Sequence, residues 1–142
     1  MSLGRRAARR EALFLLYQQD LMELQPERAL ARAEEGGTEV DAYTRRLVLG
    51  VNDHRGDIDA LLERHLRDWS VARLATVERS ILRLAVFEVV YVEDVPAEVA
   101  IDEAVELAKR YASNEAATLV NGVLGAVHTD PAAGEGYTRD QR

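Results

Sequence analysis

Residues 76–92, TVERSILRLAVFEVVYV, form the most apolar stretch of the chain. Apolar side chains recur in it every three or four positions, which is the spacing of one face of an α-helix. The residues on that face are Val77, Ile81, Leu84, Ala85, Val89 and Val92. The pattern predicts a helix, and its apolar content places this helix at the centre of a bundle.

The same helical spacing continues on both sides of this segment. It predicts a first helix over about 5–24 and a short second helix that starts at Pro26. A third helix is expected to open at a capping pair formed by Thr38 and Asp41, and Asp57 is expected to cap a fourth. Alternation of apolar and polar residues, the mark of a half-buried strand, is absent. The sequence therefore predicts an all-α fold, a bundle of about seven helices.

The C-terminal part of the chain has clear helix boundaries. Pro96 ends the central helix, because the residue before a proline avoids the helical region, and Ser113 is expected to cap the last helix. Gly122 lies inside that last helix, where glycine costs about 1 kcal/mol relative to alanine, so we interpret it as a site of close helix–helix packing. Residues 129–142 hold few apolar side chains and are expected to form a disordered tail, which leaves 1–128 as the folded domain.

Composition excludes several classes of protein. The 142 residues include no cysteine, so neither a disulfide framework nor a thiolate metal site is expected. The three histidines are scattered without metal-ligand spacing, and no nucleophile–base pair or phosphate-binding loop can be assembled. We therefore expect no enzyme activity, no metal and no cofactor. No apolar run of about 18 residues and no signal peptide is present, which favours a cytoplasmic location.

Charge is distributed unevenly along the chain. The formal net charge is −7, yet the first ten residues carry four arginines and no acid. Subtracting those four charges leaves about −11 on the rest of the chain. Guanidinium groups bind phosphates with two parallel hydrogen bonds and stack on bases, so the arginine cluster favours binding of single-stranded RNA. The alternative is a solvated N-terminal arm. The acidic group Asp102, Glu103 and Glu106 is interpreted as a solvated helix face, since no catalytic partner lies nearby.

Three stretches together resemble the NusB family. The first is RRAARREAL at 5–13, followed by Leu16 and Tyr17. The second is VERSILRLAVFE at 77–88. The third consists of DVP at 94–96, VAIDEAVELAK at 99–109 and VNGVL at 120–124. Each stretch alone is a weak signal, whereas all three in this order and at these spacings are specific, and they span about 5–128.

The resemblance implies a fold and a function. Members of that family are all-α proteins made of two packed helical subdomains, which agrees with the bundle predicted from the helical spacing. They are transcription antitermination factors that bind the boxA element of rRNA leader transcripts. They do so together with NusE, a ribosomal small-subunit protein, within the antitermination complex on RNA polymerase. The acidic body of this chain would suit a basic partner of that kind.

The resemblance also implies which residues bind. For single-stranded boxA-type RNA, they are Arg5, Arg6, Arg9, Arg10, Tyr17, Asn114 and Glu115. For NusE, they are Glu78, Arg79, Glu88 and Tyr91. The chain departs from the family pattern at Leu119, where relatives usually carry phenylalanine, and at Ala116, where they often carry serine. If that aromatic residue contacts RNA, one base-stacking interaction is missing here.

Two other functions are open from the sequence. The helical N-terminal module of rRNA cytosine methyltransferases also resembles NusB, so the chain could be an RNA-targeting module of that kind. It could also be a protein–protein adaptor that does not contact RNA.

Overall fold

The α5 helix, Thr76–Tyr91, forms the centre of the structure. In the computed structural model, which describes residues 4–67 and 70–134, every residue from Ser80 to Tyr91 is buried. Helices α1, α3, α4, α6 and α7 all pack against α5, so no face of this helix is open to solvent along that stretch. The prediction of a central helix at this position is confirmed.

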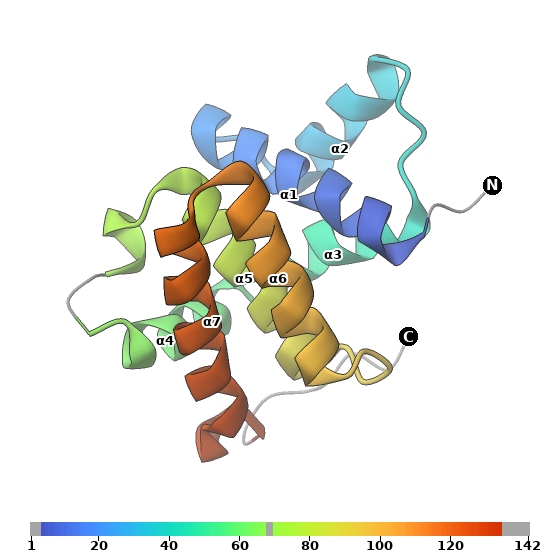
Figure 1. The fold of residues 1–142 in the computed structure, drawn as a ribbon. Helices are drawn as coiled ribbons and strands as arrows, with labels where there is room; N and C mark the ends of the chain where they lie inside the picture. Colours follow the sequence, from blue (N-terminus) through green and yellow to red (C-terminus); the bar gives the residue numbers. More distant parts are fainter. Residues whose placement is uncertain (1–3, 68–69, 135–142) are drawn as a thin grey trace.

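Seven α-helices, with no strand, make up the described part of the chain (Figure 1). Besides α5 they are α1 (Arg5–Met22), α2 (Pro26–Glu35), α3 (Ala42–Asp53), α4 (Arg55–His65), α6 (Ala97–Tyr111) and α7 (Asn114–Thr129). Two short 3₁₀ helices, η1 (Val71–Arg73) and η2 (Pro131–Gly134), complete them. The predicted all-α fold is confirmed. None of the helices in 4–67 and 70–134 is long and apolar enough to cross a membrane.

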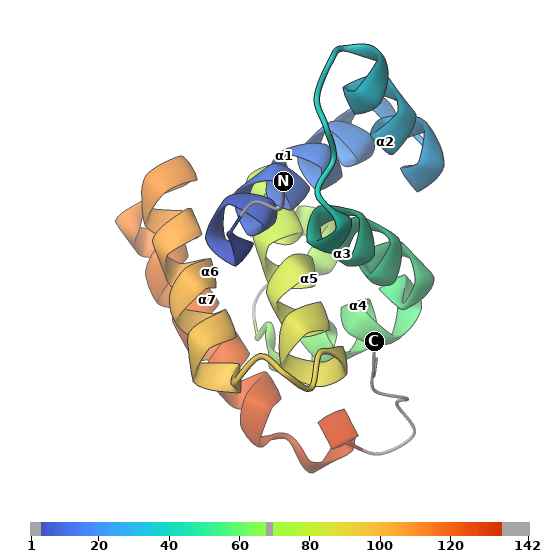
Figure 2. The ribbon, with the colours of Figure 1, turned by 90° about the vertical axis from the view of Figure 1, so that its right-hand side faces the viewer.

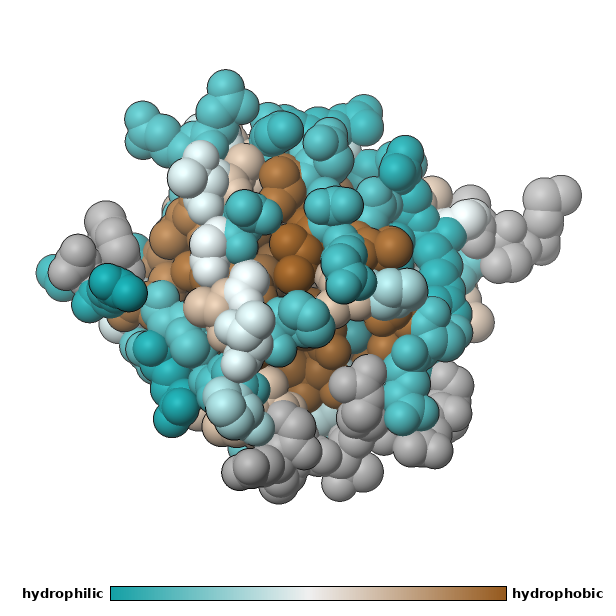
Figure 3. Space-filling model, turned by 60° about the horizontal axis from the view of Figure 1, so that its bottom comes forward, coloured by the Kyte–Doolittle hydropathy of each residue, from teal (hydrophilic) through white to brown (hydrophobic). Residues whose placement is uncertain are grey.

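The helices form two groups. Helices α1, α2 and α3 pack on one another, while α4, α6 and α7 pack around α5, as Figure 2 shows from the side. α1 lies across α5 and thereby joins the two groups. Figure 3 shows one face of this assembly, where hydrophilic side chains surround a smaller apolar area. An apolar area of that kind is ordinary for a protein surface and by itself indicates no partner.

Helix ends follow the capping rules at two positions. Ser113 caps α7, because its Oγ accepts a hydrogen bond from the Ala116 N–H at 3.0 Å, as predicted. Asp41 caps α3 through the Tyr43 N–H at 2.9 Å, so the expected capping pair with Thr38 is wrong. α4 begins at Arg55, and Asp57 lies inside its first turn instead of preceding it.

Close backbone packing occurs at a glycine that the sequence pattern did not single out. A Cβ atom on Gly50 of α3 would lie 2.1 Å from Cζ of Phe87, so only glycine lets the ring of Phe87 pack against α3. Apart from its chain neighbours and the backbone of its own helix, a Cβ on Gly122 would have no described atom within 4 Å, and Gly122 is exposed. The predicted close contact at Gly122 is therefore wrong.

The fold extends beyond residue 128. Asp130 is buried, and its carboxylate accepts hydrogen bonds from Arg64 at 3.0 Å and from the Ala132 N–H at 2.9 Å. Its Oδ2 also lies 2.8 Å from Nε2 of His65. These bonds, led by the backbone one, lower the pKa of Asp130 to about 2. The tail predicted over 129–142 thus begins with structured residues up to Gly134, and 135–142 lie outside the described residues.

Candidate nucleic-acid interface

The arginine cluster lies on the first two turns of α1. No acidic residue occurs in the first turn, and no side chain caps it. Arg5 reaches Asp94 at 2.9 Å, and its guanidinium lies 4.3 Å from the ring centroid of Tyr43. The hydrogen bond from Arg5 lowers the pKa of Asp94. Arg5 is therefore already engaged by an acid and by an aromatic ring within the protein.

Arg9 points into the core. Its Nε donates to both carboxylate oxygens of Glu88 at 2.8 and 2.9 Å, and its side chain is only 7% exposed. Burial by itself would lower the pKa of Arg9, but the hydrogen bonds and charge of Glu88 raise it. Tyr43 also donates its hydroxyl to Glu88, and burial together with the charge of Glu88 raises the pKa of that hydroxyl. Arg9 therefore anchors α1 on α5, and little of its side chain is left exposed for the RNA contact that the family resemblance implies.

Arg6 and Arg9 share a carboxylate on α6. Arg6 binds Glu103 through Nε at 2.9 Å and through its terminal nitrogen at 3.0 Å, and Arg9 approaches the same group at 3.5 Å. The hydrogen bond and charge of Glu103 raise the pKa of Arg6. The interpretation of Glu103 as part of a solvated face is wrong, because two arginines cover this carboxylate, which is 12% exposed. Asp102 and Glu106 are exposed, as expected.

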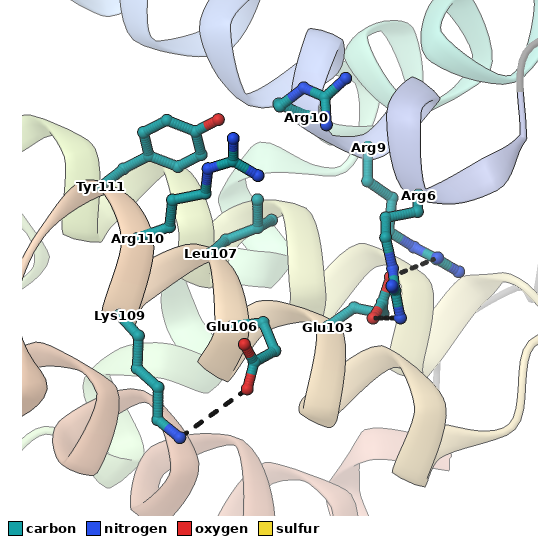
Figure 4. Close-up of a pocket in the computed structure, with 9 residues that line it drawn as sticks. All are labelled: Arg6, Arg9, Arg10, Glu103, Glu106, Leu107, Lys109, Arg110 and Tyr111. Carbon is teal, nitrogen blue, oxygen red and sulfur yellow. Dashed lines mark hydrogen bonds and ion pairs between the residues drawn. The ribbon is translucent and has the colours of Figure 1, made fainter.

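A hollow of about 430 Å³ lies between α1 and α6 (Figure 4). It is lined by Arg6, Arg9, Arg10, Glu103, Glu106, Leu107, Lys109, Arg110 and Tyr111. We call this the α1–α6 groove. Lys109 lies 3.7 Å from Glu106, a long contact between two exposed side chains. Arg10 and Arg110 have no acidic partner within residues 4–67 and 70–134. The free positive charge of the groove therefore comes from opposite walls.

Aromatic side chains border the groove. Tyr111 lines it, and Phe14 on α1 packs edge-on against Tyr111 with ring centroids 5.2 Å apart. Phe14 is 43% exposed, and Tyr17, one turn further along α1, is 37% exposed. Arg110 lies 5.5 Å from the ring centroid of Tyr111. The combination of free guanidinium groups and exposed rings is suited to phosphates and bases.

Sequence reasoning found part of this surface. It named Arg6, Arg9 and Arg10 in the groove and Tyr17 further along α1, but it missed Phe14, Lys109, Arg110 and Tyr111. Lys109, Arg110 and Tyr111 stand together in the sequence as two basic residues followed by an aromatic one, which is a pattern that could have indicated them. That this segment lies close to α1 depends on the fold. Asn114 and Glu115 are exposed in the first turn of α7, directly after this segment, and they do not line the groove.

The predicted partner-binding residues do not form one exposed face. Glu88 is 2% exposed and paired with Arg9, and Tyr91 is fully buried with its ring 4.0 Å from that of His54. Arg79 binds Asp20 at 2.7 Å and three backbone carbonyls, which ties α5 to α1 and η1. Glu78 is half-buried. Glu88 and Tyr91 are therefore not exposed to a partner in this structure, because other helices cover α5 from Ser80 to Tyr91.

The family model described as the NusB family matches residues 6–129 of this chain. The chain belongs to the NusB family. It is 45% identical over 128 residues to the transcription antitermination protein NusB of Bacillus velezensis, covering 90% of this chain and 98% of that protein. Identity to the NusB protein of Bacillus subtilis is 40% over 128 residues, with coverage of 90% and 97%.

Solved NusB structures share the fold. The structure of T. maritima NusB is similar with a TM-score of 0.82 at 34% identity, covering 92% of this chain and 94% of that one. A crystal structure of the antitermination factors NusB and NusE in complex with dsRNA includes a chain with a TM-score of 0.78 at 34% identity, with coverage of 87% and 95%. The resemblance to the NusB family that the three sequence stretches indicated is confirmed.

No group of three or more histidine, aspartate or glutamate side chains is placed to hold a metal ion within residues 4–67 and 70–134.

Proposed function

We propose that this chain is a transcription antitermination factor that binds RNA in the α1–α6 groove and acts together with NusE. The observation that carries the proposal is the pair of arginines on opposite walls, Arg10 and Arg110, which have no acidic partner among the described residues. Similarity to transcription antitermination proteins, and to a chain solved in a complex of NusB and NusE with dsRNA, supports the same assignment.

The side chains best placed to bind a phosphate are the cations that have no acidic partner. An arginine already paired with a carboxylate has to give up that partner before it binds a phosphate, whereas Arg10 and Arg110 have no carboxylate to give up among the described residues. Lys109 adds a third positive charge that is only loosely held. Arg6 lines the groove but is paired with Glu103, and Arg5 does not line it and is paired with Asp94, so we assign both a smaller share of the binding.

Base binding is the task we assign to the aromatic residues. Every base has a flat face that stacks on an aromatic ring, and such stacking contributes about 1–3 kcal/mol per base. Phe14 and Tyr17 offer exposed rings along α1 beside the groove, and Tyr111 lies in its wall. Unstacked bases are available in single strands, so we propose a single-stranded boxA-type element as the ligand.

A salt titration of RNA affinity tests this function. On single strands each neutralised phosphate contributes about 0.7 to the slope of log K against log salt. We expect the double variant Arg10→Ala/Arg110→Ala to flatten that slope by up to about 1.4 and to bind RNA more weakly at all salt concentrations. Arg73→Ala is the matched control, since Arg73 is an exposed arginine on η1 that does not line the groove.

The result decides the location of the site. An unchanged slope in a folded double variant would move RNA binding away from the α1–α6 groove. Because the similar NusB chain was solved with dsRNA, the titration uses a boxA-type single strand, its scrambled version and a duplex. Preference for the duplex would contradict the role we assign to the rings.

For NusE we propose a contact on the exposed acidic side of α6. Glu98 and Asp102 lie one turn apart there, with exposed Val99 between them. A basic ribosomal protein would be attracted by this charge. Replacing Glu98 and Asp102 with lysine should weaken NusE binding, most clearly at low salt. Glu78→Lys tests the position on α5 that the family resemblance implies. If only this variant changes the affinity for NusE, and the Glu98 and Asp102 variants do not, the interface lies on α5 and not on α6.

A further inference from the structure

Glu103 lines the α1–α6 groove and contacts two arginines of α1. Its carboxylate holds the Arg6 guanidinium through two hydrogen bonds of 2.9 and 3.0 Å and also lies 3.5 Å from Arg9 (Figure 4). It comes from the middle of α6, whereas both arginines come from α1. One carboxylate therefore neutralises charge that the RNA groove would otherwise present.

The two arginines differ in how firmly they are held. Arg9 is 7% exposed and has Glu88 as its principal partner, so it cannot leave the core. Arg6 is 82% exposed, and Glu103 is its partner within the described residues. An ion pair with a solvent-exposed arginine is weak because water competes for both charges. Arg6 can therefore exchange one anion for another, while Arg9 stays in place.

A phosphate is a suitable replacement for the carboxylate. The guanidinium fork binds carboxylate and phosphate oxygens with the same two parallel hydrogen bonds. The side chain of Arg6 lines the groove, so a phosphate bound there lies within its reach. After such an exchange Glu103 would still have Arg9 at its side, which compensates its charge in the covered position.

We propose that Glu103 sets the RNA affinity of the groove by competing with an RNA phosphate for Arg6. This inference rests on the proposed RNA-binding function. Glu103 lowers the affinity for a ligand whose phosphate binds Arg6, because Arg6 has to be withdrawn from the carboxylate first. Such a ligand gains the guanidinium contact in return, whereas a ligand with no phosphate within reach of Arg6 leaves the pair with Glu103 intact. The carboxylate is thus a specificity-determining residue and not only a structural one.

The test is a double-mutant cycle on RNA binding. Glu103→Gln keeps the size of the side chain and an oxygen that accepts a hydrogen bond from Arg6, but it removes the charge. We expect Glu103→Gln to bind boxA-type single-stranded RNA about two- to fivefold more tightly than the unchanged chain. In an Arg6→Ala background the same change should give no such gain, because the group released by it is absent. Affinities are measured by fluorescence anisotropy at fixed salt.

Glu106→Gln is the control. Glu106 lines the same groove and carries the same charge, but its partner is Lys109 at 3.7 Å and not Arg6. Its effect on affinity should be smaller and equal in both backgrounds. Urea unfolding of each variant verifies that the fold is intact.

Each outcome distinguishes the two proposals. If the unchanged chain does not bind RNA, the proposed function fails. If it binds and Glu103→Gln gives no gain, the role of Glu103 is refuted while the function stands. A gain of equal size with and without Arg6 would also overturn the inference, because it would show a general effect of charge and no exchange of partners.

Discussion

Replacing Arg9 with methionine tests whether the buried ion pair between Arg9 and Glu88 stabilises the fold. Methionine retains an unbranched chain of similar length but removes both hydrogen bonds to Glu88. The Glu88 carboxylate is 2% exposed, so the variant leaves a negative charge in the core with no cation beside it. We expect this to destabilise the protein strongly.

The structure sets the size of the effect. Breaking a buried ion pair by removing one partner costs about 3–5 kcal/mol. The hydroxyl of Tyr43 still donates to Glu88 in the variant, so we expect the lower end of that range, about 3 kcal/mol. With a typical dependence of about 2 kcal/mol per molar urea, the unfolding midpoint should fall by about 1.5 M.

Urea denaturation followed by far-ultraviolet circular dichroism measures this midpoint. Arg10→Met is the matched control, because Arg10 lies next in the chain but faces the groove, and its replacement should change stability by no more than about 0.5 kcal/mol. Adding Glu88→Gln to Arg9→Met removes the unpaired charge and keeps an acceptor for Tyr43, so stability should partly return. Equal midpoints for the two single variants would refute the buried ion pair as an anchor of α1.

Two further predictions concern packing and pH. Gly50→Ala should destabilise the fold by about 1–3 kcal/mol, because its Cβ would overlap the Phe87 ring. Gly122→Ala should stabilise the fold by up to about 1 kcal/mol, because alanine is the better helix former and nothing crowds this position. Thermal unfolding in which Gly50→Ala is neutral would contradict the packing argument. The pKa of Asp130 is about 2 in the folded protein and about 3.9 in an unfolded chain. Its contribution to stability is therefore complete above about pH 4 and is lost as the pH falls toward 2. Asp130→Asn should flatten this part of the pH–stability curve, and an identical acid dependence in both proteins would show that Asp130 makes no contribution.

The sequence was a good guide wherever the determining interactions are local. The three- to four-residue spacing of apolar side chains predicted the helices, because a helix face is defined by residues on adjacent turns. Ser113 was identified as a cap because a cap bonds to the backbone of its own helix three residues away. Asp41 was recognised as part of a capping pair, but the choice between it and Thr38 depends on where the loop before α3 turns.

The sequence was a poor guide to which polar groups are exposed. Four arginines in ten residues indicated a uniform basic patch, yet the fold divides them into a buried anchor at Arg9, two ion-paired residues and a free guanidinium at Arg10. The partners responsible, Asp94, Glu88 and Glu103, lie 79 to 97 residues away in the chain. Spacing along α1 contains no information about them.

The sequence by itself determined that the chain is helical, where most of its helices lie, and that it resembles the NusB family. Those properties depend on residues close together in the chain or on the order of short motifs. Only the tertiary structure decided which charges are free. It brings the end of α6 beside α1 and thereby adds Lys109, Arg110 and Tyr111 to the groove, while burying Glu88 and Tyr91 inside. The reason is physical: a charge is available to a ligand only if no opposite charge is packed against it, and that depends on which distant segments the fold brings together.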